Sequence, residues 1–139
     1  MTPKVFKLSS IIDFDVLGIV SAAPAYKLCH FINQETTLNL MRDKDLELDL
    51  EGLSEPSFFS YFEYCPPETE YYFTLVQNKG SNAYLVPEKK ELDYLLIIRD
   101  DYPEKIPNQI KTELGKVDLI QAIFLLPVEK LKSKENLIF

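Results

Sequence analysis

Glycine and cysteine are both scarce in this chain, and each scarcity removes a class of function. Only four of the 139 residues are glycine, and they form neither a G-x-G-x-x-G nor a G-x-x-x-x-G-K-[ST] pattern, so the usual glycine-rich phosphate cradles are excluded. The two cysteines, Cys29 and Cys65, are too few and too far apart for a disulfide framework or a C-x-x-C metal or redox pair. We therefore expect a reduced, cytoplasmic protein, and no motif implies a cofactor.

Histidine occurs once, as His30, which limits acid–base chemistry at neutral pH. His30 directly follows Cys29 on a predicted helix, where successive side chains point about 100° apart, so we do not expect the two to form a nucleophile–base pair. The sequence also has no G-x-S-x-G elbow. We expect Cys29 to be a small buried residue and His30 to be exposed.

Basic residues and long apolar runs are also in short supply. Lysine and arginine number 15 against 22 acidic residues, a net charge of −7 that would repel a phosphate backbone, so nucleic acid is not an expected partner. The lysines at 130, 132 and 134 are interpreted as a solvated tail, with a phosphate or acidic-peptide contact as the alternative. No apolar run approaches the ~20 residues that span a bilayer, and the first residues lack an apolar signal segment, so no membrane association is expected.

Carboxylates occupy every second position from 43 to 51, with leucines between them at 46, 48 and 50, which places the carboxylates on one face of a predicted strand. A calcium-binding loop needs ligands that converge around a glycine turn, but Leu48 stands at the glycine position. We interpret the acidic residues as a solvent face or a charged edge strand, and no metal site is predicted. The residues are Asp43, Asp45, Glu47, Asp49 and Glu51.

The pattern of apolar residues that is present predicts a single α+β domain over residues 1–139, with a mainly antiparallel sheet and two principal helices. Strands are predicted at 14–20, 38–50 (as one strand or two), 58–64, 71–77, 84–86, 93–98 and 119–126. The strand at 93–98 is expected to be buried on both faces. Helices are predicted at 22–34, with Ser21 as N-cap, and from Pro103 or Pro107 to Gly115, with Asp100 or Asp101 as cap. The two strand–helix–strand units suggest a split βαβ or ferredoxin-like arrangement.

One stretch resembles a known motif. Residues 86–94 read Val-Pro-Glu-Lys-Lys-Glu-Leu-Asp-Tyr. This stretch resembles the motif of the bacterial IPExxxVDY family, in which Val86 stands for the isoleucine, Leu92 stands for the valine, and the other specified residues match. The last ten residues, 130–139, also look like the family's ending. The resemblance implies a protein family with no assigned activity, and therefore no known site to carry over.

Three residues of this stretch are the candidate site: Glu88, Asp93 and Tyr94. Pro87 is expected to close the strand at 84–86, so Glu88 and Asp93 would lie at the two ends of one turn, with the Tyr94 phenol nearby. Two carboxylates brought close can raise one pKa toward neutrality, which would suit acid–base chemistry or ligand binding. The alternative is that the carboxylates accept backbone N–H groups to fix the turn and the tyrosine packs as part of the core.

The chain ends in Asn-Leu-Ile-Phe at 136–139, which is unusually apolar for a terminus. We expect it to dock, either on its own domain or on a second copy, where aromatic surface among Phe58, Phe59, Tyr61 and Phe62 would receive it. The sequence therefore favours a protein-interaction or self-associating module without catalysis, with a homodimer or another protein as partner. The alternative is a small-ligand-binding protein or an enzyme that uses Glu88, Asp93 and Tyr94.

Overall fold

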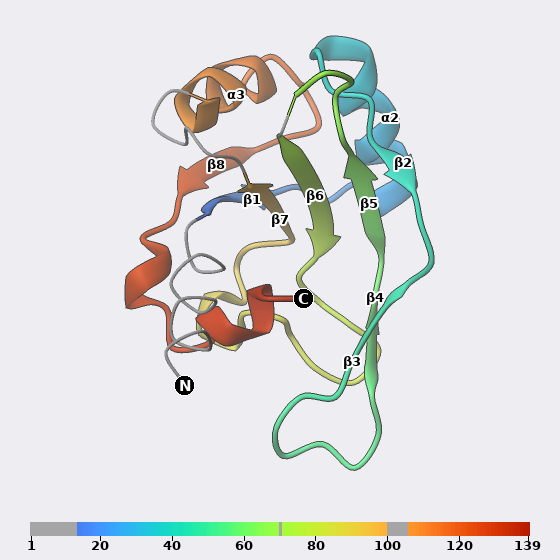
Figure 1. Ribbon diagram of the computed structural model, residues 1–139, viewed down its shortest axis with the longest axis vertical. Helices are drawn as coiled ribbons and strands as arrows, with labels where there is room; N and C mark the ends of the chain where they lie inside the picture. The colour runs from blue at the N-terminus through green and yellow to red at the C-terminus, as the bar shows by residue number, and fades with distance from the viewer. Residues whose placement is uncertain (1–13, 70, 100–105) are drawn as a thin grey trace.

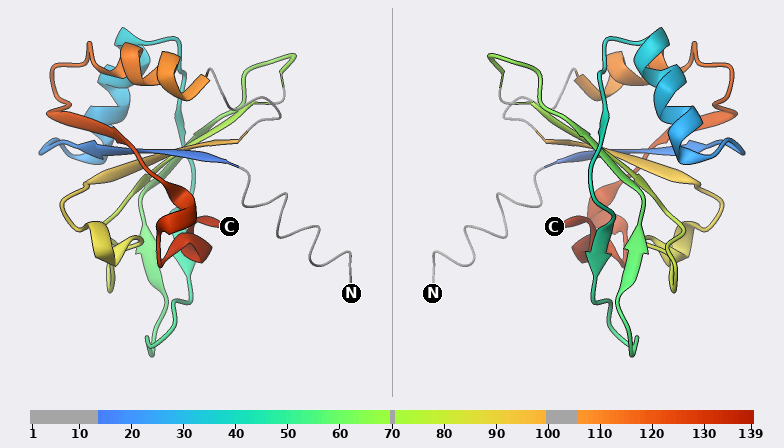
Figure 2. Two further views of the ribbon diagram at one scale, coloured as in Figure 1. Left: turned by 90° about the vertical axis from the view of Figure 1, so that its left-hand side faces the viewer. Right: turned by 90° about the vertical axis from the view of Figure 1, so that its right-hand side faces the viewer.

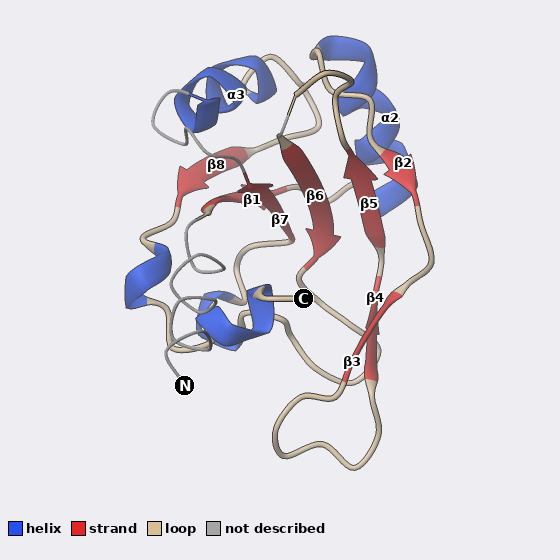
Figure 3. Ribbon diagram, in the orientation of Figure 1, coloured by secondary structure: helices blue, strands red, loops and turns tan. Residues whose placement is uncertain are grey.

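The computed structural model describes residues 14–69, 71–99 and 106–139, and its architecture is α+β, as predicted (Figures 1 and 3). The strands are β1 (Asp15–Val20), β2 (Met41–Arg42), β3 (Leu46–Leu48), β4 (Ser57–Phe59), β5 (Tyr61–Tyr64), β6 (Tyr72–Gln77), β7 (Tyr94–Arg99) and β8 (Ala122–Leu125). The helices are α2 (Ala25–Glu35) and α3 (Ile106–Leu114), with 3-10 turns η1 (Pro87–Lys89), η2 (Val128–Lys130) and η3 (Lys134–Leu137).

Six strands form one antiparallel sheet in the order β2-β5-β6-β7-β1-β8, and β3 and β4 form a separate two-stranded sheet. Strands β1 and β2, which α2 connects, run in the same direction but are separated by three other strands. Strands β7 and β8, which α3 connects, are also parallel to each other and lie on either side of β1. This is a split βαβ arrangement as expected, widened by the insertion of β5 and β6 between β7 and β2.

Both faces of the central strands are covered, so the molecule has two apolar cores. Figure 2 shows α2 and α3 on one side of the sheet, and the 3-10 turns with β3 and β4 on the other. The predicted burial of the strand at 93–98 on both faces is confirmed, because Leu96 and Ile98 belong to the helix-side core while Leu95 and Ile97 belong to the opposite one.

The two helices begin close to where the sequence predicts, but the N-cap predicted for the first of them is wrong. The N-cap of α2 is Pro24, without a side-chain hydrogen bond. The buried Ser21 instead donates its hydroxyl to the Leu119 carbonyl at 2.7 Å, and its oxygen accepts the Ala23 N–H at 3.2 Å, ahead of the helix. Pro107 lies in the first turn of α3, whereas Asp100, Asp101 and Pro103 lie outside the described residues. Gly115 follows α3 without adopting the left-handed conformation predicted for it.

Residues 84–86 do not form the predicted strand. Tyr84 makes an isolated bridge to Lys79, after which the chain enters η1. The partner of β6 is therefore β7, and the segment between them folds over the face of the sheet opposite the helices, where Leu85, Val86 and Leu92 are buried. Leu92 packs directly on Gly18 of β1, and a Cβ atom added to Gly18 would lie 2.6 Å from the Cδ1 atom of Leu92.

Candidate functional site

The stretch that resembles the family motif is held in place from inside by Asn78, which is fully buried. Its side-chain amide donates to the carbonyls of Lys89 and Leu92, at 3.0 and 2.9 Å, and its side-chain oxygen accepts the N–H of Val86 at 2.8 Å. A buried amide with both ends satisfied fixes the backbone around it. The sequence does not single out Asn78, since its partners are backbone groups that a sequence does not reveal.

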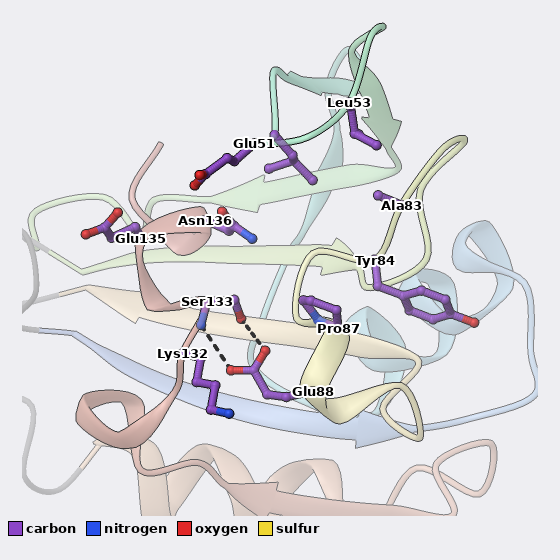
Figure 4. Close-up of a pocket in the computed structure, with 11 residues that line it drawn as sticks. Glu51, Leu53, Ala83, Tyr84, Pro87, Glu88, Lys132, Ser133, Glu135 and Asn136 are labelled. Atoms are coloured by element: carbon purple, nitrogen blue, oxygen red, sulfur yellow. Dashed lines mark hydrogen bonds between the residues drawn. The ribbon is translucent and has the colours of Figure 1, made fainter.

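Glu88 lies on η1, and its carboxylate points at the C-terminal segment (Figure 4). It accepts the Ser133 N–H at 3.0 Å and the Ser133 hydroxyl at 2.8 Å. Partial burial acts to raise the pKa of Glu88, but hydrogen bonds from its own backbone and from Ser133 outweigh this and lower the pKa below its ordinary value. Glu88 is thus held as a carboxylate and joins two segments far apart in the chain.

The hollow beside this contact, the Glu88 pocket, has a volume of about 600 Å³. Its walls come from three segments: the loop after β3, the residues around η1, and the C-terminal segment (Figure 4). Glu51 and Glu135 add two further carboxylates, and Lys132 a single ammonium. The pocket is therefore acidic on balance.

Asp93 and Tyr94 fasten a different connection, the one between β1 and α2. The Asp93 carboxylate accepts the Ser21 N–H at 2.8 Å, and the Tyr94 hydroxyl donates to the Ala23 carbonyl at 2.6 Å. Burial raises the pKa of Tyr94 to about 12, and the negative charge of Asp93 adds to this. The phenol is therefore protonated and acts as a hydrogen-bond donor.

Asp93 and Tyr94 line a second hollow, the Tyr94 pocket, of about 320 Å³, together with Lys79 and Lys90. Glu88 does not line this pocket, and neither Asp93 nor Tyr94 lines the Glu88 pocket. The structure thus brings Asp93 and Tyr94 together and places Glu88 in a separate hollow. Each of the three has a hydrogen-bond partner within the protein.

The only histidine and the cysteine beside it lie as predicted. Cys29 is buried against the Leu40 carbonyl, and burial raises the pKa of its thiol to about 11, an effect that a hydrogen bond from Asn33 only partly offsets. His30 is exposed, with its ring edge-on to Phe31. A thiol that remains protonated is a poor nucleophile.

The acidic residues between 43 and 51 surround short strands at the margin of the molecule. Asp45 pairs with Arg42 at 2.5 Å, and both are exposed. Within residues 14–69, 71–99 and 106–139, no group of three or more histidine, cysteine or acidic side chains is placed to hold a metal ion. In the same part of the chain, neither helix has the length and apolar character needed to cross a bilayer.

The apolar terminus docks on its own domain. Leu137 is fully buried, its carbonyl accepts a hydrogen bond from Arg99 at 3.0 Å, and Phe139 packs edge-on against Tyr61. The Arg99 guanidinium lies over three aromatic rings, those of Phe14, Tyr72 and Phe139, at 5.3 to 5.8 Å from their centroids. Burial lowers the pKa of Arg99, and the rings and carbonyl compensate for the lost hydration.

The aromatic patch predicted to receive a terminus is mostly internal. Phe59 is fully buried and Phe62 nearly so, because the pleat turns them into the two cores, and Phe58 is the large exposed side chain of the four. Tyr61 is partly buried, and its hydroxyl lies 3.0 Å from that of Tyr72 while both donate to the Glu63 carboxylate.

The outer strand β8 has two adjacent large apolar side chains that are exposed. The sequence predicts a buried strand here, but β8 is at the edge of the sheet, with Phe124 50% and Leu125 44% exposed. No charged residue occurs from 119 to 128. The opposite edge, β2, is only two residues long and includes Arg42.

The comparisons with known proteins give no match: no family model, no curated protein and no solved structure corresponds to this chain. The resemblance of residues 86–94 to the IPExxxVDY motif therefore stays a prediction.

Proposed function

We propose that this chain is a protein-interaction module without catalysis of its own, and that it engages its partner by strand addition along β8. The observation that carries the proposal is the edge position of an uncharged strand with two large, half-exposed apolar side chains. A free sheet edge presents a row of unpaired N–H and C=O groups, and an added strand pairs with them while its side chains meet those of the edge.

The contrast between β8 and protected sheet edges supports the choice of β8 as the interaction site. Natural sheets block unwanted pairing with charged side chains, prolines or very short strands at their edges. The β2 edge has two of these features, since it is two residues long and Arg42 lies on it. The β8 edge has none within Ala122–Leu125, because Pro127 follows only after the strand has ended. An edge left open in this way suits a segment that is paired during function.

The alternative, a small-ligand site or an enzyme built on Glu88, Asp93 and Tyr94, stays a prediction. Its support is the Tyr94 pocket, which Asp93 and Tyr94 line together. Against it stand the internal hydrogen bonds of all three side chains, since a group that must bind or transfer a proton needs to be within reach of a ligand. The β8 edge makes no such competing contact on its outer side within the described residues.

A photo-crosslinking experiment in the native cell tests the proposal. Phe124→p-benzoylphenylalanine replaces one exposed aromatic ring by another on β8, and Tyr26→p-benzoylphenylalanine does the same on α2, where Tyr26 is 74% exposed. We expect irradiation to link a discrete protein at position 124 but not at position 26. Failure to crosslink at 124, or the same products from both positions, would contradict strand addition at β8.

A further inference from the structure

The β8 edge is complementary to an identical β8 edge. We propose that its partner is a second copy of this chain, paired antiparallel about a two-fold axis that passes through Phe124. The inference rests on the proposed function and names the partner for that edge. Three properties of the strand carry it: the direction of its free backbone groups, the side chains that would meet, and the distribution of charge.

The backbone groups of β8 alternate between the inner and the outer side. Leu126 donates its N–H to the Val16 carbonyl at 2.9 Å, and Phe124 lies opposite Gly18 in the same ladder. In an antiparallel ladder, alternate residues direct both backbone groups toward the same neighbour. Ile123 and Leu125 therefore direct theirs outward, to the side of β8 on which none of the described strands pairs.

A two-fold axis through Phe124 uses these groups fully. It places Ile123 of one copy opposite Leu125 of the other, and the reverse pair follows from the symmetry. Both members of each pair have outward N–H and C=O groups, so each pair can exchange two hydrogen bonds, and the two six-stranded sheets become one continuous sheet.

The side chains brought together in this register are apolar on both faces. Phe124 meets Phe124 of the second copy on the face opposite the helices, where its own neighbour on β1 is Gly18, over which Leu92 packs. Ile123 meets Leu125 of the second copy on the helix side, in line with Leu17 and Ile19 of β1. Each exposed apolar side chain of β8 is covered by the pairing.

Charge favours a second copy at this edge rather than at the other. Each chain has a net charge of −7, so two copies repel unless their contact keeps carboxylates apart. The absence of charge from 119 to 128 achieves this at β8. A two-fold axis at β2 would bring Arg42 near its own copy, with Asp43 and Lys44 directly after it. A strongly basic partner would find no carboxylate on β8 to pair with.

Sedimentation velocity on the purified full chain, over a series of concentrations, tests the inference. We expect a species of twice the 16.1 kDa chain mass. Phe124→Lys sets two ammonium groups opposite each other on the axis, and Ile123→Pro removes an outward N–H without removing a bond to β1. We expect each variant to weaken dimerisation by about tenfold or more, since a lost ladder bond or a facing like charge costs on the order of 1 kcal/mol.

The matched control is Tyr26→Lys, which adds the same charge at an exposed aromatic position on α2 and should leave the dimer unchanged. Circular dichroism establishes that each variant is folded. A monomeric wild type, or a dimer that Phe124→Lys and Ile123→Pro leave intact, overturns the inference. If the wild type is monomeric but position 124 crosslinks a different protein in the cell, the second copy is wrong and the interaction function stands; if position 124 crosslinks nothing as well, both are wrong.

Discussion

At the scale of single residues, the stretch that resembles the family motif forms side-chain hydrogen bonds to segments that are distant in the chain. Glu88 holds Ser133, Asp93 holds the N–H of Ser21, and Tyr94 holds the carbonyl of Ala23. A carboxylate can accept two bonds and a phenol can donate one from a buried ring, so the residue types fit these contacts. The same residue types also suggest an acid–base site, because a sequence gives the chemistry of a side chain but not its partner.

Removing the Tyr94 hydroxyl should measure how much one of these hydrogen bonds contributes to the free energy of unfolding. Tyr94→Phe keeps the buried ring and leaves the Ala23 carbonyl without its donor at 2.6 Å, so we expect the free energy of unfolding to fall by about 1–2 kcal/mol. Tyr26→Phe, at a ring 74% exposed, should change it by less than about 0.5 kcal/mol. Urea unfolding of both variants checks this. Equal losses, or none from Tyr94→Phe, would show that the hydroxyl is not a structural contact.

At the scale of elements, the sequence predicts the features that the pattern of residues along one segment determines. It misses the features that depend on which other segments lie beside that one. The burial of β7 follows from its uninterrupted apolar run, and the interruption between β2 and β3 falls at the polar residues 43–45. The edge position of β8 depends on strand order, which local patterns do not contain. Ser21 has the chemistry of an N-cap, but a carbonyl of a distant segment takes its hydroxyl. The contact between Glu88 and Ser133 is missed in the same way, since the two residues are 45 positions apart in the chain.

The turn before Tyr84 contains Gly80, where the neighbouring side chains leave no room for a Cβ atom. A Cβ at Gly80 would lie 2.6 Å from both the Phe59 ring and the Ser57 hydroxyl, and Phe59 is fully buried and cannot move aside. We expect Gly80→Ala to lower the free energy of unfolding by about 1–3 kcal/mol through overpacking. Gly115→Ala, whose nearest neighbour would be 3.3 Å away, should cost less than about 0.5 kcal/mol. Denaturant unfolding compares them, and a Gly80→Ala protein as stable as Gly115→Ala would contradict the packing argument.

At the scale of the whole molecule, the C-terminal segment completes the face opposite the helices. It is attached through Glu88 to Ser133, through the Leu85 carbonyl to Asn136, and through Arg99 to Leu137. Beneath it lie the buried side chains of the second core. The segment buries Leu137 within its own domain and leaves Phe139 38% exposed, whereas Phe124 and Leu125 of β8 are 50% and 44% exposed.

The attachment through Glu88 should weaken in acid. The pKa of Glu88 is lowered in the folded protein, so the unfolded chain binds a proton at higher pH than the folded one, and folding stability falls as the pH drops below the ordinary value of 4.5 and through the folded pKa. Because Glu88 is largely exposed, we expect the contribution to be at most about 1 kcal/mol. Glu88→Gln lacks this titration and should lose less stability on acidification than the wild type, whereas Glu91→Gln, at an exposed position of the same segment, should follow the wild type. Chemical denaturation at a series of pH values checks this, and parallel stability curves for the wild type and Glu88→Gln would rule out Glu88 as the acid-sensitive attachment of the C-terminal segment.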